Sequence, residues 1–228
     1  MYAITTFSAC TFLLHVYNLR MSTPPGKPRA KRKAAATRQT IVATAKQLII
    51  EHGLNALTLE AVAEEAHIAV QTIYNRVGGR PALLIAVAEQ ALEEHGKYMS
   101  DAHASSAPAR EKMRLIANAY TRFAFERPNE FSLLLDPQGE PEALQRISEL
   151  ISDQNAKTAA VIRAGMLSGT IRDDLDPDLI ALAAWAMMNG ILSLAFRDDQ
   201  THYYAKQVPV LIDTAIELLI GGMFTPQE

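Results

Sequence analysis

The chain has 228 residues, of which 49% are hydrophobic and 21% charged, and its formal net charge is −3. This is the composition of a folded globular protein. The single cysteine, Cys10, excludes a disulfide framework and a cysteine-based zinc site. No run of about 18 uninterrupted apolar residues predicts a membrane span. We therefore expect a cytoplasmic protein that does not contact a membrane.

The two parts of the chain differ in charge. Residues 1–100 contain 11 Lys and Arg against 7 Asp and Glu, whereas residues 101–228 contain 11 against 18. The first part therefore suits a phosphate surface, and the second would be repelled by one.

The N-terminal segment has two candidate starts. Residues 1–20 lack the positive segment and cleavage site of a secretory signal, and Met21 is an equally suitable start. Residues 1–20 are thus either outside the native protein or a disordered tail. Residues 21–33 hold three prolines, one glycine and five basic residues without an acid, which predicts a mobile basic arm. We expect residues 1–33 to form a disordered extension that ends in Lys31, Arg32 and Lys33.

Hydrophobic periodicity predicts helices throughout and no sustained strand, and hence an all-α protein. One helix ends near Gly53, a short helix follows the cap residue Thr58, and a second short helix turns Ile73 and Val77 toward the core. A longer helix from about Pro81 to about His95 should link this part to the rest. Further helical patterns cover residues 109–127, 130–136, 140–169, 177–197 and 202–223.

Residues 58–84 contain the most informative pattern, two short helices joined by a tight turn. Such a unit places its second helix in the major groove of DNA. The outward side of that helix carries hydrogen-bonding or basic groups, namely Gln71, Thr72, Tyr74, Asn75 and Arg76. Arg76 and Arg80 flank it where phosphates would pass, and the basic arm enters just upstream. The alternatives are ordinary surface decoration for Thr72 and Tyr74, and a solvated tail for the arm.

This stretch resembles a known family. Residues 66–84, AHIAVQTIYNRVGGRPALL, are similar to the signature of TetR-family regulators, and the similarity covers residues 38–90. The resemblance implies a helix-turn-helix DNA-binding domain at 34–80, in which Thr72 and Tyr74 meet the operator and Arg80 holds a phosphate. It also implies a helical regulatory and dimerisation domain at 81–228.

Two departures from the family pattern have structural consequences. His67 replaces the usual glycine of the turn, so we expect His67 to adopt a left-handed backbone, which His tolerates better than most residues. Leu59 and Glu60 stand where several relatives carry a polar or basic DNA contact. Glu60 is expected to stabilise the helix N-terminus instead.

The C-terminal half resembles a subtype of the family. Residues 120–124 precede Pro128, and residues 185–190 read WAMMNG, where the subtype has a W-x-x-x-H-G motif. The resemblance implies the same regulatory domain. Asn189 replaces the His of the motif, which leaves the role of this position open.

The last two predicted helices carry apolar stripes that suggest a dimer interface of four helices, two from each subunit. The stripes consist of Leu179, Leu182, Ala183 and Ala186 on one helix and Val208, Leu211, Ile212, Ala215 and Leu219 on the other. A small-molecule effector would fill a cavity between the helices from residue 109 to residue 197. The candidate lining residues are Phe123, Phe131, Met166, Trp185 and Met188. Their apolar character suggests a hydrophobic or aromatic ligand, although an ordinary core would look the same.

Two other classes of function agree less well with the sequence. An enzyme is not expected because no nucleophile with a base, phosphate loop or catalytic carboxylate pair is evident, and the histidines suggest neither a metal nor a cofactor. A helical protein-interaction bundle would explain the C-terminal half but not the DNA-reading helix. We therefore expect a ligand-responsive repressor that binds a palindromic operator as a homodimer, and activation instead of repression stays open.

Overall fold

The computed structural model describes residues 27–135, 141–196 and 206–224, and these residues confirm the all-α class. Their only β pairing is an isolated bridge between Ile171 and Phe224. The helices of the described part are α2 (Lys27–His52), the 3-10 helix η1 (Leu54–Ala56), α3 (Leu59–Glu65), α4 (Val70–Arg76), α5 (Arg80–Ala104), α6 (Ala109–Glu126), α7 (Pro128–Leu135), α8 (Pro141–Leu167), α9 (Pro177–Ala195) and α10 (Val208–Met223).

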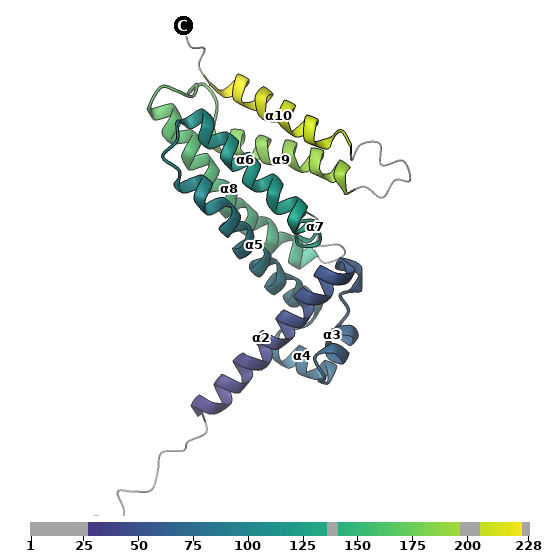
Figure 1. Cartoon of the computed structure of the whole chain (residues 1–228). Coiled ribbons are helices and arrows are strands. Elements are labelled where there is room, and N and C mark those ends of the chain that lie inside the picture. Colours follow the sequence, from purple (N-terminus) through teal and green to yellow (C-terminus); the bar gives the residue numbers. More distant parts are fainter. Residues whose placement is uncertain (1–26, 136–140, 197–205, 225–228) are drawn as a thin grey trace, which may run out of the picture.

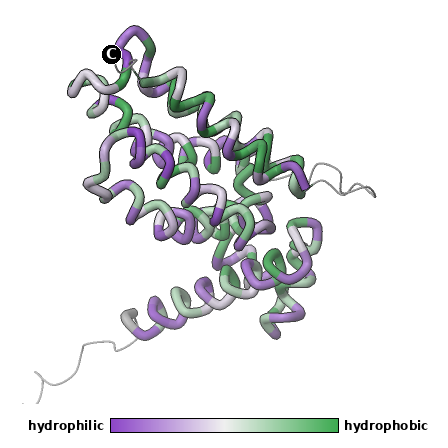
Figure 2. Tube along the Cα trace, turned by 45° about the horizontal axis from the view of Figure 1, so that its top comes forward, coloured by the Kyte–Doolittle hydropathy of each residue, from purple (hydrophilic) through white to green (hydrophobic). Residues whose placement is uncertain are grey.

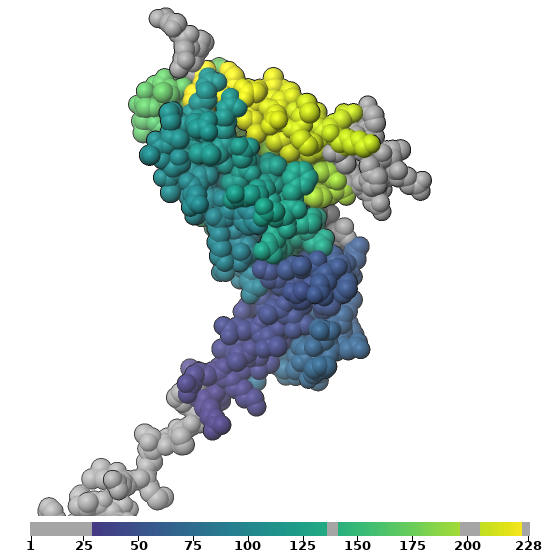
Figure 3. All heavy atoms as spheres, in the orientation of Figure 1, coloured from purple at the N-terminus to yellow at the C-terminus, as the bar shows by residue number. Residues whose placement is uncertain are grey.

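The helices form a small N-terminal unit and a larger C-terminal one. Helices α2, α3 and α4 pack on one another, and α5 leads from them into the bundle of α6 to α10 (Figure 1). In the small unit, Ile41 and Ile49 of α2 meet Val62 of α3 and Ile73 of α4 in a fully buried core. The two units are joined through a narrow waist (Figure 3). Helix α5 and the contact of α7 with α2 lie at this waist.

The basic arm predicted for residues 21–33 is wrong in part, because α2 begins at Lys27. Residues 1–26 lie outside the described residues. Lys31, Arg32 and Lys33 are exposed on the first turns of the helix. The run of Lys, Arg and Ala from residue 29 to residue 36 has high helix propensity, and Pro28 is tolerated in a first turn. A helix anchored by the core further along therefore extends backward through these residues.

Helix α5 joins the two units and is longer than its sequence pattern suggested. It begins after Gly78 and Gly79, both at positive φ, with Pro81 in its first turn. Its start contributes Leu83 to the core of the small unit. Its last turns bury Met99 and Ala102 in the large unit, and it ends at Ala104, nine residues beyond the expected end at His95. A single rigid rod of about 1.5 Å per residue therefore runs from the small unit into the large one.

In the large unit, α8 packs on α5 and α9, and α9 packs on α10. The end of α8 comes close to the following loop, since a Cβ on Gly165 would lie 2.6 Å from Ile171 Cδ1. Helix α9 is long and apolar enough to cross a membrane by length and composition alone, and only 28% of that stretch is buried in the single chain. The helix leading to the C-terminus is also largely hydrophobic (Figure 2).

Candidate DNA-binding surface and ligand cavity

The turn between α3 and α4 has the predicted backbone. His67 has a φ of 53°, and no other described residue except glycine has a positive φ, so the expected left-handed conformation is confirmed. Before the turn, the Thr58 hydroxyl accepts a hydrogen bond from the Ala61 N–H at 3.0 Å and caps α3 as expected. After it, Ile68 N–H bonds to the Ala63 carbonyl at 2.9 Å. These bonds and the buried Ile73 fix α4 against α3.

Helix α4 presents its predicted polar side to solvent. Gln71, Asn75 and Arg76 are exposed, and Tyr74 is 53% exposed, which is unusual for a large aromatic residue. Thr72 is half-buried. The Gln71 side-chain amide donates to Asn75 Oδ1 at 3.3 Å, and the Tyr74 ring lies over Gly79, where a Cβ would be 3.2 Å from Cε1. Short or planar groups on a packed helix are suited to reading base edges in a major groove.

Arg80 has a structural contact that the sequence did not reveal. Its Nε–H donates to the Leu57 carbonyl at 3.1 Å and so ties the start of α5 to the segment before α3. The side chain is half-buried. A phosphate contact of Arg80 stays a prediction.

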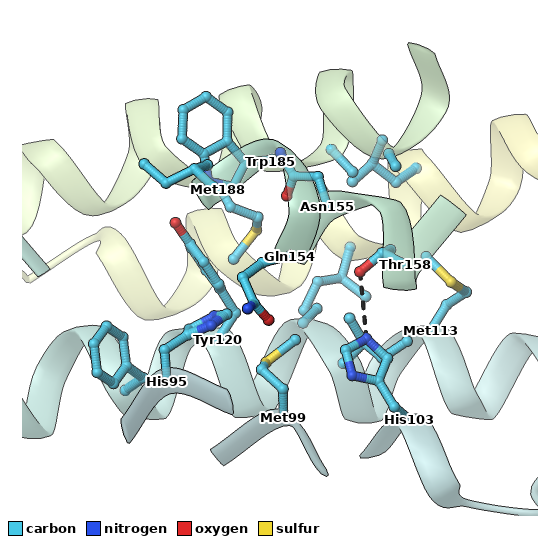
Figure 4. Close-up of a pocket in the computed structure, with 18 of the residues that line it drawn as sticks. His95, Met99, His103, Met113, Tyr120, Gln154, Asn155, Thr158, Trp185 and Met188 are labelled. Carbon is cyan, nitrogen blue, oxygen red and sulfur yellow. Dashed lines mark hydrogen bonds between the residues drawn. The ribbon is translucent and has the colours of Figure 1, made fainter. Parts of the chain in front are cut away.

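The large unit contains a mostly apolar cavity of about 90 Å³ that is partly open to solvent. Four of the five predicted ligand residues line it: Phe123 from α6, Phe131 from α7, and Trp185 and Met188 from α9. Figure 4 shows Trp185 and Met188 in this wall. Met166 does not, and its assignment was wrong. It lies two turns past the lining residue Thr158 on α8, a displacement of about 12 Å along the helix, and it packs against the core beyond the cavity.

Several polar side chains that the sequence did not single out also reach this cavity. His95, Gln154, Asn155 and Thr158 lie around its middle, with Tyr120 beside His95 (Figure 4). The Tyr120 hydroxyl donates to Asn189 Oδ1, and burial raises the pKa of Tyr120. In the sequence, a single His on an apolar helical stripe is typical of a core residue or of a helix end. The position of His95 at the cavity could have been predicted only from the full length of α5.

Asn189 therefore has a role in this chain. Its side chain is buried, at 9% exposure, and accepts the hydrogen bond of a cavity-wall tyrosine. The position that carries His in the W-x-x-x-H-G motif thus links α9 to α6, whereas membership of that subtype has no support.

A groove of about 470 Å³ adjoins the cavity between α7, α8 and α9. The two share part of their walls, namely Leu134, Leu135, Ile151, Asn155 and Trp185. A shift of these side chains would therefore join the cavity to the groove. The cavity is smaller than the engineered cavity of about 150 Å³ that holds benzene, so a ligand of that size or larger would shift these side chains or extend out of the cavity.

Helix α7 contacts both the cavity and the small unit. Phe131, Leu134 and Leu135 line the cavity. From the same helix, the Asn129 amide donates to the Ile50 carbonyl of α2 at 3.0 Å. The neighbouring Glu130, 1% exposed, has its Oε1 3.0 Å from Lys46 Nζ of α2 and its Oε2 3.8 Å from Arg127 Nε. The carboxylate makes no hydrogen bond of good geometry in the described chain, so these two cations stabilise its charge.

Comparison with known proteins matches both units. Residues 41–87 match the pattern of bacterial regulatory proteins of the tetR family, and residues 106–193 match the tetracyclin repressor-like C-terminal domain. The chain belongs to the TetR family of transcriptional regulators. It is a DNA-binding regulator, and this family is not enzymatic.

Individual relatives of this TetR-family chain are distant in sequence. The fatty acid metabolism regulator protein of Bacillus subtilis is 22% identical over 185 residues, which are 80% of this chain and 93% of the relative. A structure of unknown function from Rhodococcus sp. RHA1 superposes with a TM-score of 0.68 at 23% identity, covering 83% of this chain and 96% of the other. The FadR regulator of Bacillus subtilis, solved with stearoyl-CoA, gives 0.64 at 21% identity, covering 81% and 98%.

The structure of this TetR-family regulator revises the expected dimer stripe on α10. Val208, Ile212 and Ala215 are buried in the chain's own core, and Leu211 and Leu219 are half-buried. The outward apolar residues of α10 are instead Val210 and Leu218, 68% and 69% exposed. The stripe on α9 is exposed as expected, with Leu179 at 64%, Leu182 at 48%, and Ala183 and Ala186 open to solvent. Periodicity located apolar residues on α10 but could not assign them to the inner or outer face.

Proposed function

We propose that this chain is a ligand-released repressor, which binds a palindromic operator as a homodimer and dissociates from it when a mostly apolar molecule enters the large unit. The observation that carries the proposal is the position of α7, which forms one wall of the cavity and bonds to α2 of the DNA-binding unit.

DNA recognition is assigned to two groups of residues. The reading group on α4 comprises Gln71, Thr72, Tyr74, Asn75 and Arg76. The basic cluster on the first turns of α2 consists of Lys31, Arg32 and Lys33, whose flexible charged side chains suit phosphates or a minor groove. Arg80 is assigned to a phosphate beside the reading group. One helix-turn-helix contacts few base pairs, so specificity requires two copies about 34–36 Å apart on the DNA.

The homodimer is assigned to the outer faces of α9 and α10. Leu179, Leu182, Val210 and Leu218 would leave apolar surface in water on a monomer, which favours association of two copies. Gly190 on the same side of α9 has no heavy atom within 4 Å of the place of a Cβ, so a partner helix has room to approach there. Burial of this face between subunits also accounts for the unusually apolar composition of α9.

We assign the effector site to the cavity. The small volume of the cavity suggests a mechanism for release from the operator. An apolar molecule larger than the cavity of about 90 Å³ would press on its walls, including the part that it shares with the groove. One of these walls is α7. Displacement of Phe131, Leu134 and Leu135 would move Asn129 and Glu130 against α2. The spacing of the two reading helices in the dimer would change, and the population would shift toward a form that does not fit the operator.

The relatives suggest which compounds to test first. The FadR regulator of Bacillus subtilis was solved with stearoyl-CoA, and the apolar cavity with its adjoining groove has a chemistry that suits an acyl chain. Long-chain acyl-CoAs are therefore the first candidates, with free fatty acids and aromatic compounds as comparisons.

The test is a binding assay on the DNA next to the gene. Purified protein is mixed with fluorescent duplexes that tile the flanking intergenic region, with and without stearoyl-CoA or decanoyl-CoA. We expect one palindromic duplex to bind two chains and to be released by an acyl-CoA. A scrambled duplex is the control. Binding of one chain per site, or a complex that none of these compounds affects, would contradict the proposal.

A further inference from the structure

His95 is an unpaired polar group in the wall of an otherwise apolar cavity. Its residue is 7% exposed, and neither ring nitrogen has a hydrogen-bond partner among the described residues. The ring lies edge-on between Tyr120 and Phe123, with centroid distances of 5.5 and 5.1 Å. Buried polar groups are nearly always hydrogen-bonded, so an orphan imidazole at a cavity is a site where a ligand can supply the missing partner.

Three of the neighbouring polar side chains already have hydrogen-bond partners. The Tyr120 hydroxyl donates to Asn189. His103 Nε2 lies 3.5 Å from Thr158 Oγ1 (Figure 4). Gln154 Oε1 accepts a hydrogen bond from the Lys157 ammonium at 2.9 Å. His95 differs from these three because both of its ring nitrogens lack a partner, so a ligand that bonds to it supplies a missing hydrogen bond.

The ring is uncharged at neutral pH. Burial, and to a lesser degree the positive charge of His103 and Lys157, lowers the pKa of His95 to about 4. A neutral imidazole offers one N–H donor and one nitrogen acceptor. No Lys, Arg, Asp or Glu is among the residues that line the cavity in the described chain. A charged group on the ligand would lack a counter-charge here, whereas an uncharged carbonyl, hydroxyl or amide would be satisfied.

We propose that His95 recognises the polar group that the effector places in this cavity, an uncharged hydrogen-bonding group joined to an apolar chain. The apolar part lies against Met99, Met113 and Met188, whose flexible side chains can adapt to its shape. This inference rests on the proposed function, because it concerns the ligand of the same cavity, and it adds which residue selects the ligand and by what chemistry.

The chain contains its own reporter for the test. Trp185 is the only tryptophan in the sequence and lines the cavity, so a change in its fluorescence reports occupancy. The probes are four molecules with a six-carbon chain: 1-hexanol, hexanamide, hexanoate and 1-chlorohexane. The first two carry an uncharged hydrogen-bonding group, the third a charge at pH 7, and the last neither.

For the wild-type protein at pH 7, we expect hexanol and hexanamide to bind about tenfold more tightly than chlorohexane and hexanoate. H95F should remove this preference and leave the affinity for chlorohexane unchanged. It should also raise the melting temperature, since Phe fills a similar shape without an unsatisfied polar group. Higher stability with lost selectivity distinguishes ligand recognition from a structural role. M166L, a volume-conserving change on α8 outside the cavity lining, should keep the preference.

Three results would overturn the inference alone: equal affinity of the wild type for hexanol and chlorohexane, an unchanged preference in H95F, or hexanoate binding as tightly as hexanamide at pH 7. If no probe alters Trp185 fluorescence, the assignment of the cavity to the effector fails as well. Loss of operator release with intact probe selectivity would contradict the proposed function and leave the role of His95 standing.

Discussion

Glu130 and Lys46 provide the sharpest test of how the two units communicate. The carboxylate is 1% exposed and 3.0 Å from the Lys46 ammonium, whose side chain is 20% exposed. We consider three variants: K46M, E130L and the double variant. Each replacement has a similar volume and no charge, so packing between α2 and α7 should be kept.

The magnitudes follow from burial. K46M leaves a buried carboxylate with only Arg127, at 3.8 Å, and should lower the free energy of unfolding by about 2–4 kcal/mol. E130L leaves an ammonium that can reach water, and should cost about 1–2 kcal/mol. The double variant should lie near the wild type, because buried ion pairs are often replaceable by packed apolar residues. The double-mutant cycle should therefore give a coupling of about 3–6 kcal/mol, the sum of the two single losses.

Chemical denaturation of the four proteins measures the cycle, and fluorescence anisotropy on the operator measures release by the effector. The double variant should bind the operator and the effector, but require a higher effector concentration for release, because one of the contacts between α7 and α2 has lost its charge. Additive losses of stability, with release unchanged in all variants, would refute a signalling role for this pair.

The remaining predictions concern the DNA surface, the dimer, the turn and pH. Y74A should lower operator affinity by about 1–3 kcal/mol without affecting the affinity for a scrambled duplex. Alanines in the basic cluster should weaken binding to both duplexes and flatten the slope of log affinity against log salt by about 0.9 per lost phosphate contact. Equal losses on both duplexes for Y74A would remove Tyr74 from the reading group. L179E should sediment as a monomer, whereas L167E, at an exposed site off the α9 face, should stay dimeric; a monomeric wild type at micromolar concentration would refute the interface. H67G should raise the melting temperature by about 2–4 °C, since glycine relieves about 1 kcal/mol at positive φ, and H67A should not; a lower value for H67G would contradict this. The pKa of His95 is lower in the folded chain than its ordinary value of 6.5, so the unfolded chain binds the extra proton. The free energy of unfolding should therefore fall by up to about 3 kcal/mol as the pH drops from 6.5 to 4. Urea titrations at both pH values should show a smaller fall for H95F.

The DNA-binding unit was predictable because local chemistry determines it. The cap at Thr58, the short buried stripes and the turn at His67 are each encoded within a few residues, and the structure has all three. The ends of long helices were less predictable. Gly96 follows His95 and suggests a stop, yet α5 continues because Met99 and Ala102 are buried against other helices. Tertiary packing outweighs the cost of one glycine, about 1 kcal/mol.

The cavity was predictable in its aromatic walls and not in its polar group. Phe123, Phe131, Trp185 and Met188 are large apolar residues of the second unit, and any compact arrangement brings some of them together. Met166 is also a large apolar residue of this unit, but it lies outside the cavity lining. The sequence does not show how far along the bundle axis a residue lies from the cavity. His95 comes from the linking helix, which the pattern assigned to the boundary between units. Its role depends on neighbours that are 25 or more positions away in the sequence.

The residues that line the cavity and the α7 residues that contact α2 are mostly different, and this separation has an evolutionary consequence. Most of the cavity wall comes from α5, α6, α8, α9 and α10, and the contact with α2 that involves Asn129 and Glu130 comes from α7 alone. Substitutions at the cavity-lining positions of these other helices can alter which molecule fits without changing the residues that face DNA or the α7 residues that touch α2. A duplicated gene could thus acquire a new inducer while it keeps its operator, and selection would act on the cavity wall and the operator surface separately.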